Sequence, residues 1–464
     1  MKNNIWILTE ERPKKKVIKK ILDIYCNDRK IIPEKSATNI LPLIKFGAKF
    51  AHRYKFLGYK INGIDNIFLR TVGGFSSFAD FLLFESEKEP NPEEQFKNCL
   101  YIIEETKTGS GSKGSRNSSA AQRATKFAWL YHQKKTKSYD YELIMLYNKP
   151  DDQMKKDPIS VRSIKQCLKS IGVKMIGDNS SSLKELQSFK DVIKAVNSKP
   201  LPQKGNTPVR ITEKSSNHLY LSGTLSKPKE KGNISYDPNI GGHIGIITAL
   251  RHLGYLGQIT ITDHKVKQST INNMRGNKYT FATGFLDFNL EGIKIPNKLQ
   301  EKANDKYWYY EEKTEKTASI LLHLLCNYLD DYHLIYENHA GAERGYFYKP
   351  NGDYEAIPKK HNNLNINLPD YVFKDEDNKK IFVLEGEMGK NLRKGQEQLK
   401  GFNLFEELYI KKFYRNYSIF RGIILSNSEE YYSDPEIIFA ITKKNKILTS
   451  KHCPKKIRDF INQP

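Results

Sequence analysis

The sequence predicts an α/β (α+β) protein with two mixed-sheet cores, each flanked by helices, on either side of a central region. Three observations favour this class. Short apolar runs alternate with segments whose apolar residues recur at helical spacing. The first and last thirds follow one design: a strand with an aspartate, a strand with paired charges, a helix and a further strand. The length of 464 residues allows roughly two to four domains.

The first third begins with a segment expected to be helical, residues 1–60, because apolar residues recur at helical spacing from Val17 to Ile24 and continue from Ile40 to Phe50. Residues 61–108 are expected to form strands, which include FADFLLF and CLYIIEE. The polar segment GSGSKGSRNSS indicates a loop. It is followed by a predicted helix from about Ala120 to His132 and a buried strand in YELIMLYN.

The rest of the chain begins with a less hydrophobic stretch, residues 150–240, in which NSKPLPQKGNTP and SKPKEKGNISYDPN indicate loops. The elements expected beyond these loops are a strand in HLYLSGTL, a helix in GGHIGIITALRHLGY closed by Gly254, a strand in QITITDH, a long helix over 302–330, strands in LPDYVF and KKIFVLEGEM, a helix in KGQEQLKGFNLFEELYIKKF and a strand in YSIFRGIILSN. The predicted domains are therefore 1–155, 156–300 and 301–464.

The charge balance points to a polyanionic partner. The chain has 76 Lys and Arg against 53 Asp and Glu, a formal net charge of +23. Nucleic acid is the first candidate, because Lys and Arg release condensed counterions when they neutralise phosphates. An anionic membrane surface is the second, although no basic amphipathic helix with a long apolar face is found. A Lys-rich surface without a specific partner is the remaining alternative.

The sequence contains no apolar run long enough for a transmembrane helix and no segment typical of a signal peptide. A cytoplasmic protein without membrane contact is therefore expected. The five cysteines are far apart and include no Cys-x-x-Cys pair, so neither a zinc ribbon nor a disulfide framework is expected. The sequence also contains no P-loop, no methyltransferase-type glycine-rich turn and no His-Glu-x-x-His pattern.

A first set of candidate site residues lies in the first third. Asp80 in FADFLLF is followed by Glu105 and Lys107 in YIIEETKT. In a strand, residues i and i+2 share a face, so Glu105 and Lys107 project together, and a neighbouring strand can bring Asp80 beside them. Two carboxylates suit Mg²⁺, which can orient and acidify a water molecule. A lysine on the same face can neutralise a phosphate, so this set suits phosphodiester hydrolysis.

A second set of candidates lies in the last third. Asp370 opens a strand in NINLPDYVF, and Glu385 and Glu387 end the apolar strand IFVLEGEM. The short polar segment KDEDNKK between them indicates a hairpin connection. Glu387 stands where the first set has a lysine, and Lys390 is a candidate for the missing cation. The alternative is a nuclease-like fold that is retained for structure or for DNA binding.

With these two patterns the chain resembles the PD-(D/E)xK nuclease superfamily, type II restriction endonucleases in particular. Asp80, Glu105 and Lys107 match the Asp…Glu-x-Lys pattern, whereas Ala79 stands where a proline often precedes the aspartate. Some members carry Glu-x-Glu, as the second set does. The resemblance implies mixed-sheet cores, Mg²⁺ as cofactor with Mn²⁺ as a substitute, and cleavage of double-stranded DNA. The expected metal ligands are Asp80, Glu105, Asp370 and Glu385.

Residues expected to contact DNA are basic or carry amides, and they lie in three segments. One follows the first catalytic set in SRNSSAAQRATKF, which resembles the loop and helix after the catalytic strand in such enzymes. Another is a weak helix candidate in the central region, KVKQSTINNMRGNKYTF, which has a composition suited to base reading but also fits a solvated helix. The expected DNA contacts are Lys113, Arg116, Gln122, Arg123, Lys126, Lys267, Gln268, Asn272, Arg275, Lys390, Arg393 and Lys394.

Two unlike sites in one chain suggest that each site cuts one strand of an asymmetric target. A working monomer then becomes plausible, and a cognate DNA methyltransferase is expected in the host of a restriction enzyme. A structure-specific or repair nuclease is the alternative among enzymes. A nucleic-acid-binding protein without catalysis, in which both carboxylate sets are surface features, is the alternative outside them.

Overall fold

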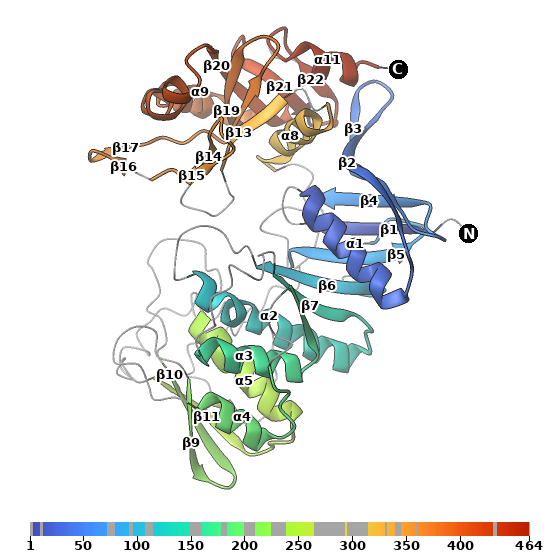
Figure 1. The fold of residues 1–464 in the computed structure, drawn as a ribbon, viewed down its shortest axis with the longest axis vertical. Helices are drawn as coiled ribbons and strands as arrows, with labels where there is room; N and C mark the ends of the chain where they lie inside the picture. The colour runs from blue at the N-terminus through green and yellow to red at the C-terminus, as the bar shows by residue number, and fades with distance from the viewer. Residues whose placement is uncertain are drawn as a thin grey trace. The chain divides into compact units, whose positions relative to one another are not determined.

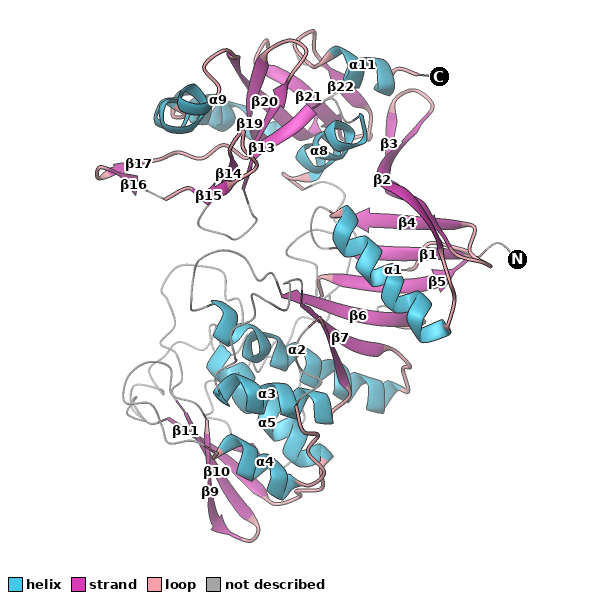
Figure 2. Ribbon diagram, viewed as in Figure 1, coloured by secondary structure: helices cyan, strands magenta, loops and turns pink. Residues whose placement is uncertain are grey.

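The computed structural model describes most of the chain. The described residues are 3–9, 13–71, 79–91, 96–106, 115–147, 159–177, 183–198, 209–223, 238–263, 293–294, 314–329, 332–338, 345–358, 360–429 and 434–463. They form a mixed α/β structure, as predicted, whose helices and strands are shown in Figures 1 and 2.

The chain divides into two compact units, and the division differs from the predicted boundaries at 155 and 300. The terminal unit comprises Met1–Ser77, Glu85–Pro92 and Tyr309–Pro464, and the central unit comprises Phe78–Phe84 and Glu93–Trp308. Residues 1–77 and residues 309–464 are therefore parts of one compact unit. Backbone hydrogen bonds from Phe50 to Asn445 (2.9 Å) and from Ile447 to Ala48 (2.8 Å) join the two within the terminal unit.

The N-terminal part of the terminal unit is mostly strand. Its elements are β1 (Asn4–Thr9), α1 (Lys15–Arg29), β2 (Glu34–Lys45), β3 (Lys49–Lys60) and β4 (Asn66–Thr71), with the strands in the order β2-β3-β4-β1. Residues 1–60 were expected to be helical, but among the described residues of this segment only α1 is a helix, and the rest is mostly strand, with residues 40–50 in the β2–β3 hairpin. Alternating burial along β3, with Phe50, Tyr54 and Phe56 inward, explains this, because period two suits a strand.

The C-terminal part of the terminal unit is built on a second sheet, in the order β15-β14-β13-β18-β19-β20-β21-β22. Its main elements are α8 (Thr317–Leu329), β13 (Tyr332–Asn338), β14 (Gly345–Tyr348), β15 (Tyr354–Ala356), β18 (Tyr371–Asp375), β19 (Lys380–Met388), α9 (Leu392–Lys400), β20 (Ser418–Ser428), β21 (Ile437–Thr442), β22 (Ile447–Thr449) and α11 (Lys455–Ile461). The three strands predicted here are confirmed. The single helix predicted after β19 is instead divided into α9, α10 (Asn403–Phe405) and a π-helical turn over Glu406–Lys411.

The central unit combines one half of a mixed sheet with a helical layer and a small sheet. Its elements are β5 (Phe81–Ser86, of which Phe81–Phe84 belong here), β6 (Cys99–Thr106), α2 (Ser115–Lys137), β7 (Glu142–Tyr147), α3 (Ile159–Ser170), β8 (Val173–Ile176), α4 (Phe189–Val196), β9 (Arg210–Ser215), β10 (His218–Gly223), α5 (Pro238–His252), β11 (Gln258–Asp263) and β12 (Ile293–Lys294). Helices α2, α3 and α5 pack together (Figure 2). The predicted α2, α5 and their neighbouring strands are confirmed, and Gly254 follows α5 with a φ of +94°.

The predicted common design of the first and last thirds is confirmed in the strand pairing. In the central unit β5 and β6 are antiparallel, while β6–β7 and β7–β8 are parallel. In the terminal unit β18 and β19 are antiparallel, while β19–β20 and β20–β21 are parallel. A helix connects the parallel pair in each case, α2 in the first and α9 in the second. We call these the N-terminal core and the C-terminal core.

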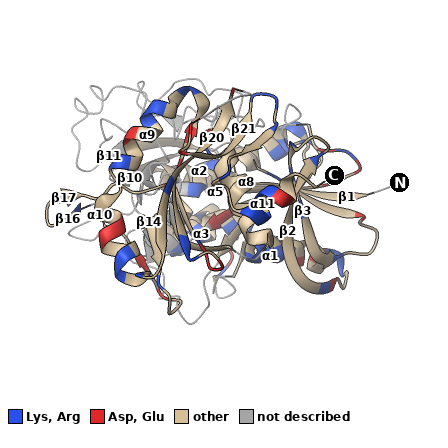
Figure 3. Ribbon diagram, turned by 90° about the horizontal axis from the view of Figure 1, so that it is seen from above, with Lys and Arg blue, Asp and Glu red and all other residues tan. Residues whose placement is uncertain are grey.

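Three further expectations concern the surface and the cysteines. No described helix is long and apolar enough to cross a membrane. All five cysteines are buried and free. Lys and Arg occur on several elements, including α3, α9 and α11 (Figure 3), so the positive charge is not confined to one basic segment.

Candidate active sites

The C-terminal core brings together the three carboxylates predicted there. Asp370 directly precedes β18, and Glu385 and Glu387 lie two residues apart on β19, where their relative exposures are 4% and 0%. The Asp370 carboxylate accepts a hydrogen bond from the backbone N–H of Gly386 (3.0 Å), and the Asp370 N–H donates to the Leu384 carbonyl (3.0 Å). These two bonds fix the aspartate beside the glutamates.

Helix α9 supplies the polar partners of the glutamates. Gln398 donates from Nε2 to Glu385 Oε1 (2.8 Å), and Lys394 Nζ donates to Glu387 Oε1. The helix can approach closely because Gly395 faces Glu387, where an added Cβ would lie 3.2 Å from Glu387 Cγ. The cation at Glu387 is therefore Lys394. The suggested Lys390 is exposed on the short turn before α9 instead.

The electrostatics of this cluster favour a cation. Burial, Asp370 and Glu387 together raise the pKa of Glu385 to about 9. Burial likewise raises the pKa of Asp370, against the opposing effect of the Gly386 N–H. Glu315, just before α8, has a raised pKa because it is partly withdrawn from water and lies near Glu387 and Asp370. Neighbouring carboxylates raise each other's pKa, and a cation bound between them lowers these pKa values again.

The donor set also fits a hard divalent cation. Glu385 Oε2 is buried and accepts no hydrogen bond from the described residues, so one carboxylate oxygen is left for another partner. Oxygen atoms of carboxylates are the ligands that Mg²⁺ prefers. Within the described ranges, no group of three or more His, Cys, Asp and Glu side chains is already arranged around a metal position. Asp370 and Glu385 are the residues that would hold the ion.

The raised pKa of Glu385 predicts a pH-dependent loss of stability. The folded chain keeps a proton up to a pKa of about 9, whereas the unfolded chain releases it near the ordinary value of 4.5. Unfolding then releases a proton between these values, so stability falls as pH rises through this window without metal. We expect Glu385→Gln to raise Tm in EDTA, with a gain that grows from about pH 5 to about pH 8.

Thermal unfolding in EDTA across this pH range measures the effect. Glu397→Gln is the matched control, because Glu397 is exposed on α9. Equal gains at both ends of the range would contradict the assignment of the proton to Glu385.

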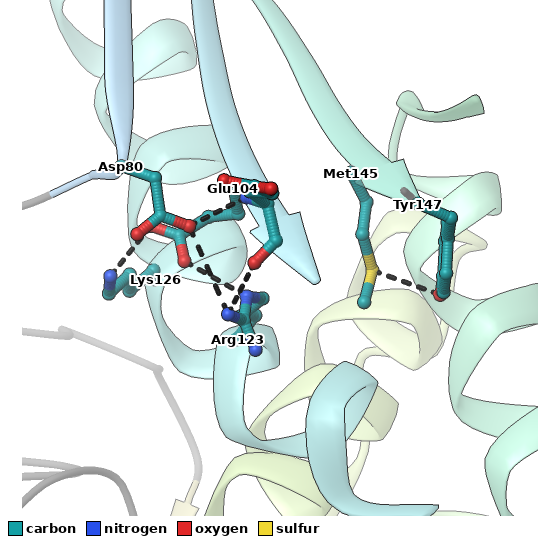
Figure 4. Close-up of polar contacts among 7 residues, drawn as sticks. Asp80, Glu104, Arg123, Lys126, Met145 and Tyr147 are labelled. Carbon is teal, nitrogen blue, oxygen red and sulfur yellow. Dashed lines mark hydrogen bonds and ion pairs between the residues drawn. The ribbon is translucent and has the colours of Figure 1, made fainter. Parts of the chain in front are cut away.

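The N-terminal core also contains a carboxylate cluster, shown in Figure 4. Asp80 directly precedes β5, and its Oδ2 accepts a hydrogen bond from the Glu105 N–H (2.6 Å). The side chain that meets α2 is that of Glu104, whose relative exposure is 1%. Lys126 Nζ donates to Glu104 Oε1 (2.6 Å), and Arg123 Nε lies 3.1 Å from Glu104 Oε2. Asp80 and Glu105 are thus neighbours, as predicted, through the Glu105 backbone.

Arg123 contacts several groups of this cluster. It donates from Nη2 to the Glu105 carbonyl (2.6 Å), and the same nitrogen lies 3.9 Å from Asp80 Oδ2. Burial raises the pKa of Glu104, Lys126 opposes this shift and Asp80 adds to it. Arg123 and Lys126 were expected to face the DNA backbone. Lys126 is instead buried against Glu104, and Arg123 is turned toward the same carboxylate, because an unpaired charge in this position would be costly.

The remaining predicted residues are less fully described. Arg116 and Gln122 lie on α2, and Arg393 is exposed on α9. Six others lie outside the described residues, namely Lys107, Lys113, Lys267, Gln268, Asn272 and Arg275. The predicted recognition helix in the central region lies outside them too.

The strand registers show which residues correspond in the two cores. Phe81 pairs with Ile103 in the N-terminal core, and Tyr371 pairs with Leu384 in the C-terminal core. Asp80 stands one residue before Phe81 and accepts the N–H of Glu105, which is two residues after Ile103. Asp370 stands one residue before Tyr371 and accepts the N–H of Gly386, which is two residues after Leu384. Glu104 therefore corresponds to Glu385, Glu105 to Gly386 and Thr106 to Glu387. Glu104 was missed, although YIIEET and FVLEGE align directly in the sequence.

No family model, curated protein or solved structure matched this chain in the comparisons made. The two cores of this chain can, however, be compared with each other through their strand registers. Function is inferred from the geometry of the two carboxylate clusters.

Proposed function

We propose that this chain is a Mg²⁺-dependent, sequence-specific endonuclease of restriction type that cuts double-stranded DNA. One observation carries the proposal. In each core an aspartate before one strand is held by a backbone N–H of the antiparallel neighbour, beside a buried glutamate of that neighbour. The arrangement that suits phosphodiester hydrolysis thus occurs twice on the same strand topology, and the two sites would each cut one strand of an asymmetric target.

The residues of the C-terminal core have separate tasks in this proposal. Asp370 and Glu385 hold the metal, which supplies Lewis acidity and a more acidic water when bound. Gln398 keeps Glu385 in place through its amide. The Lys394 side chain is 60% exposed although its ammonium contacts Glu387, so it can also reach a phosphate at the surface. The fully buried Glu387 keeps this lysine near the cluster.

The proposed partner follows from charge. A net charge of +23 favours a polyanion, and Lys394 of α9 places a cation at the C-terminal cluster, while Arg393 and Lys400 are exposed on the same helix. The proposal includes double-stranded DNA as the substrate and Mn²⁺ as a substitute for Mg²⁺. It also includes a working monomer and a cognate methyltransferase in the host. A cytoplasmic location accords with it.

Cleavage of a supercoiled plasmid tests the proposal. We expect discrete linear fragments in Mg²⁺ or Mn²⁺, no cleavage in EDTA, and ends that map to one short sequence. Cleavage at junctions or flaps without a fixed sequence would favour the structure-specific nuclease instead. Binding without cleavage under any divalent metal would leave a DNA-binding protein and overturn the proposal.

A further inference from the structure

We infer that Glu104 and Lys126, rather than Glu105 and Lys107, complete the N-terminal site with Asp80. The inference rests on the proposed function, and it changes two of the three residues that the Asp…Glu-x-Lys pattern selects. It assigns the metal-binding carboxylate to Glu104, and it takes the lysine of this site from helix α2, where Lys126 pairs with that carboxylate.

The first argument is positional. Asp80 accepts the N–H of Glu105 and Asp370 accepts that of Gly386, so the two N–H donors occupy the same place in the two cores. The residue before the donor is Glu104 in one core and Glu385 in the other. At the donor position itself the C-terminal core has a glycine, which provides no carboxylate. A site common to both cores therefore uses the residue before the donor.

The second argument concerns the two faces of the strand. Glu385 and Glu387 face α9, which provides Gln398 and Lys394. A Cβ added to Gly386 would instead lie 2.5 Å from Ser319 Oγ of α8 and 3.3 Å from Asp370 Oδ2, so it would not point toward α9. Alternation along a strand gives the corresponding residues of β6 the same pattern. The Glu104 side chain accordingly meets α2, and the Glu105 side chain starts from the other face.

The third argument concerns the helix that follows each strand. On α9, Lys394 precedes Gln398 by four residues, and on α2, Gln122 precedes Lys126 by four residues. Residues four apart lie on one face of a helix. Lys126 contacts Glu104 where Gln398 contacts its counterpart Glu385, so a lysine of α2 takes the place that an amide has on α9. Each core then has one helical lysine at its carboxylates, and the lysine of the Glu-x-Lys pattern is not needed.

Two neighbouring substitutions separate the alternatives. Glu104→Gln and Glu105→Gln each remove one negative charge from adjacent positions of β6. Mn²⁺ binding is titrated by electron paramagnetic resonance, and nicking of each strand is followed on a linear duplex that is end-labelled on one strand or the other. We expect Glu104→Gln to lose one of two bound Mn²⁺ and to slow the cut of one strand by at least about 100-fold. We expect Glu105→Gln to keep both ions and both cuts within about threefold.

The strand that is still cut serves as the internal control for folding of the terminal unit. Glu104→Gln leaves Lys126 buried without the Glu104 carboxylate, so Glu104→Gln/Lys126→Met is compared with it, and a cooperative thermal unfolding transition shows that the central unit of either variant is folded. Loss of one strand's cut in Glu105→Gln but not in Glu104→Gln overturns the inference. So does binding of a single Mn²⁺ by wild type, with that ion lost in Asp370→Asn. A wild type that cuts neither strand in Mg²⁺ overturns the proposed function instead.

Discussion

Asp370→Asn is expected to turn the double-strand cut into a nick in one defined strand. The aspartate is held by two backbone hydrogen bonds beside Glu385, so asparagine keeps its shape and removes the charge that a metal would need. Loss of a preorganised charged group of this kind costs on the order of 10²–10³-fold in rate. Conversion of supercoiled plasmid into open circles, with the nicked strand identified by sequencing, measures the effect.

Asp377→Asn is the matched control for this substitution. Asp377 lies in the turn of the same β18–β19 hairpin, where it pairs with Lys456 (3.1 Å) at an exposed position. It is expected to cut both strands as wild type does. Asp80→Asn should nick the strand that Asp370→Asn leaves intact. Loss of both cuts in either variant would contradict two independent sites, because one site alone would then serve both strands.

Lys126→Met is expected to cause the largest loss of stability among the substitutions at these sites. The lysine side chain is 7% exposed and that of Glu104 is 2% exposed, so removal of the lysine leaves a buried carboxylate that, among the described residues, keeps Arg123 as its cationic partner. Breaking a buried pair from one side costs about 3–5 kcal/mol. We expect a decrease at the lower end of this range in the free energy of unfolding, measured by urea denaturation near neutral pH.

The double variant Glu104→Gln/Lys126→Met tests the cause of that loss. It removes both charges, so most of the lost stability should return, and the coupling between the two positions should exceed about 1 kcal/mol. Lys137→Met, at the exposed end of α2, should change stability by no more than about 0.5 kcal/mol. Additive losses in the double variant would show that packing, rather than the ion pair, accounts for the effect.

The parts of the fold that the sequence predicted correctly are those with strong local signals. Apolar runs such as IFVLEGEM identified β19, and Gly254 identified the end of α5. The β2–β3 hairpin was predicted as helix because apolar spacing near Ile40 was considered without the alternation that follows from Phe50 to Phe56. Local periodicity supports more than one assignment until pairing partners are known.

The proximity of the candidate site residues was likewise predicted correctly only where the local sequence signal is strong. Asp370, Glu385 and Glu387 were predicted because their strands are short, adjacent and joined by a hairpin. Glu104 was missed because the Glu-x-Lys pattern favours Glu105, and only the register with β5 distinguishes the two. The pairing of Lys126 with Glu104 depends on how α2 packs against β6, which no spacing in the sequence specifies. A side chain predicted to face DNA was therefore found in the interior.

The hydrogen bonds that join Phe50 and Ala48 to Asn445 and Ile447 have a consequence for folding during synthesis. The β2–β3 hairpin leaves the ribosome first, and its partners follow several hundred residues later. At about 5–20 residues per second, the hairpin waits on the order of 20–80 s for them. During that time the central unit can fold as an insertion between two halves of an unfinished unit. Chaperone dependence of expression should accordingly be relieved in a circular permutant in which residues 309–464 directly precede residues 1–77, so that both halves are made consecutively.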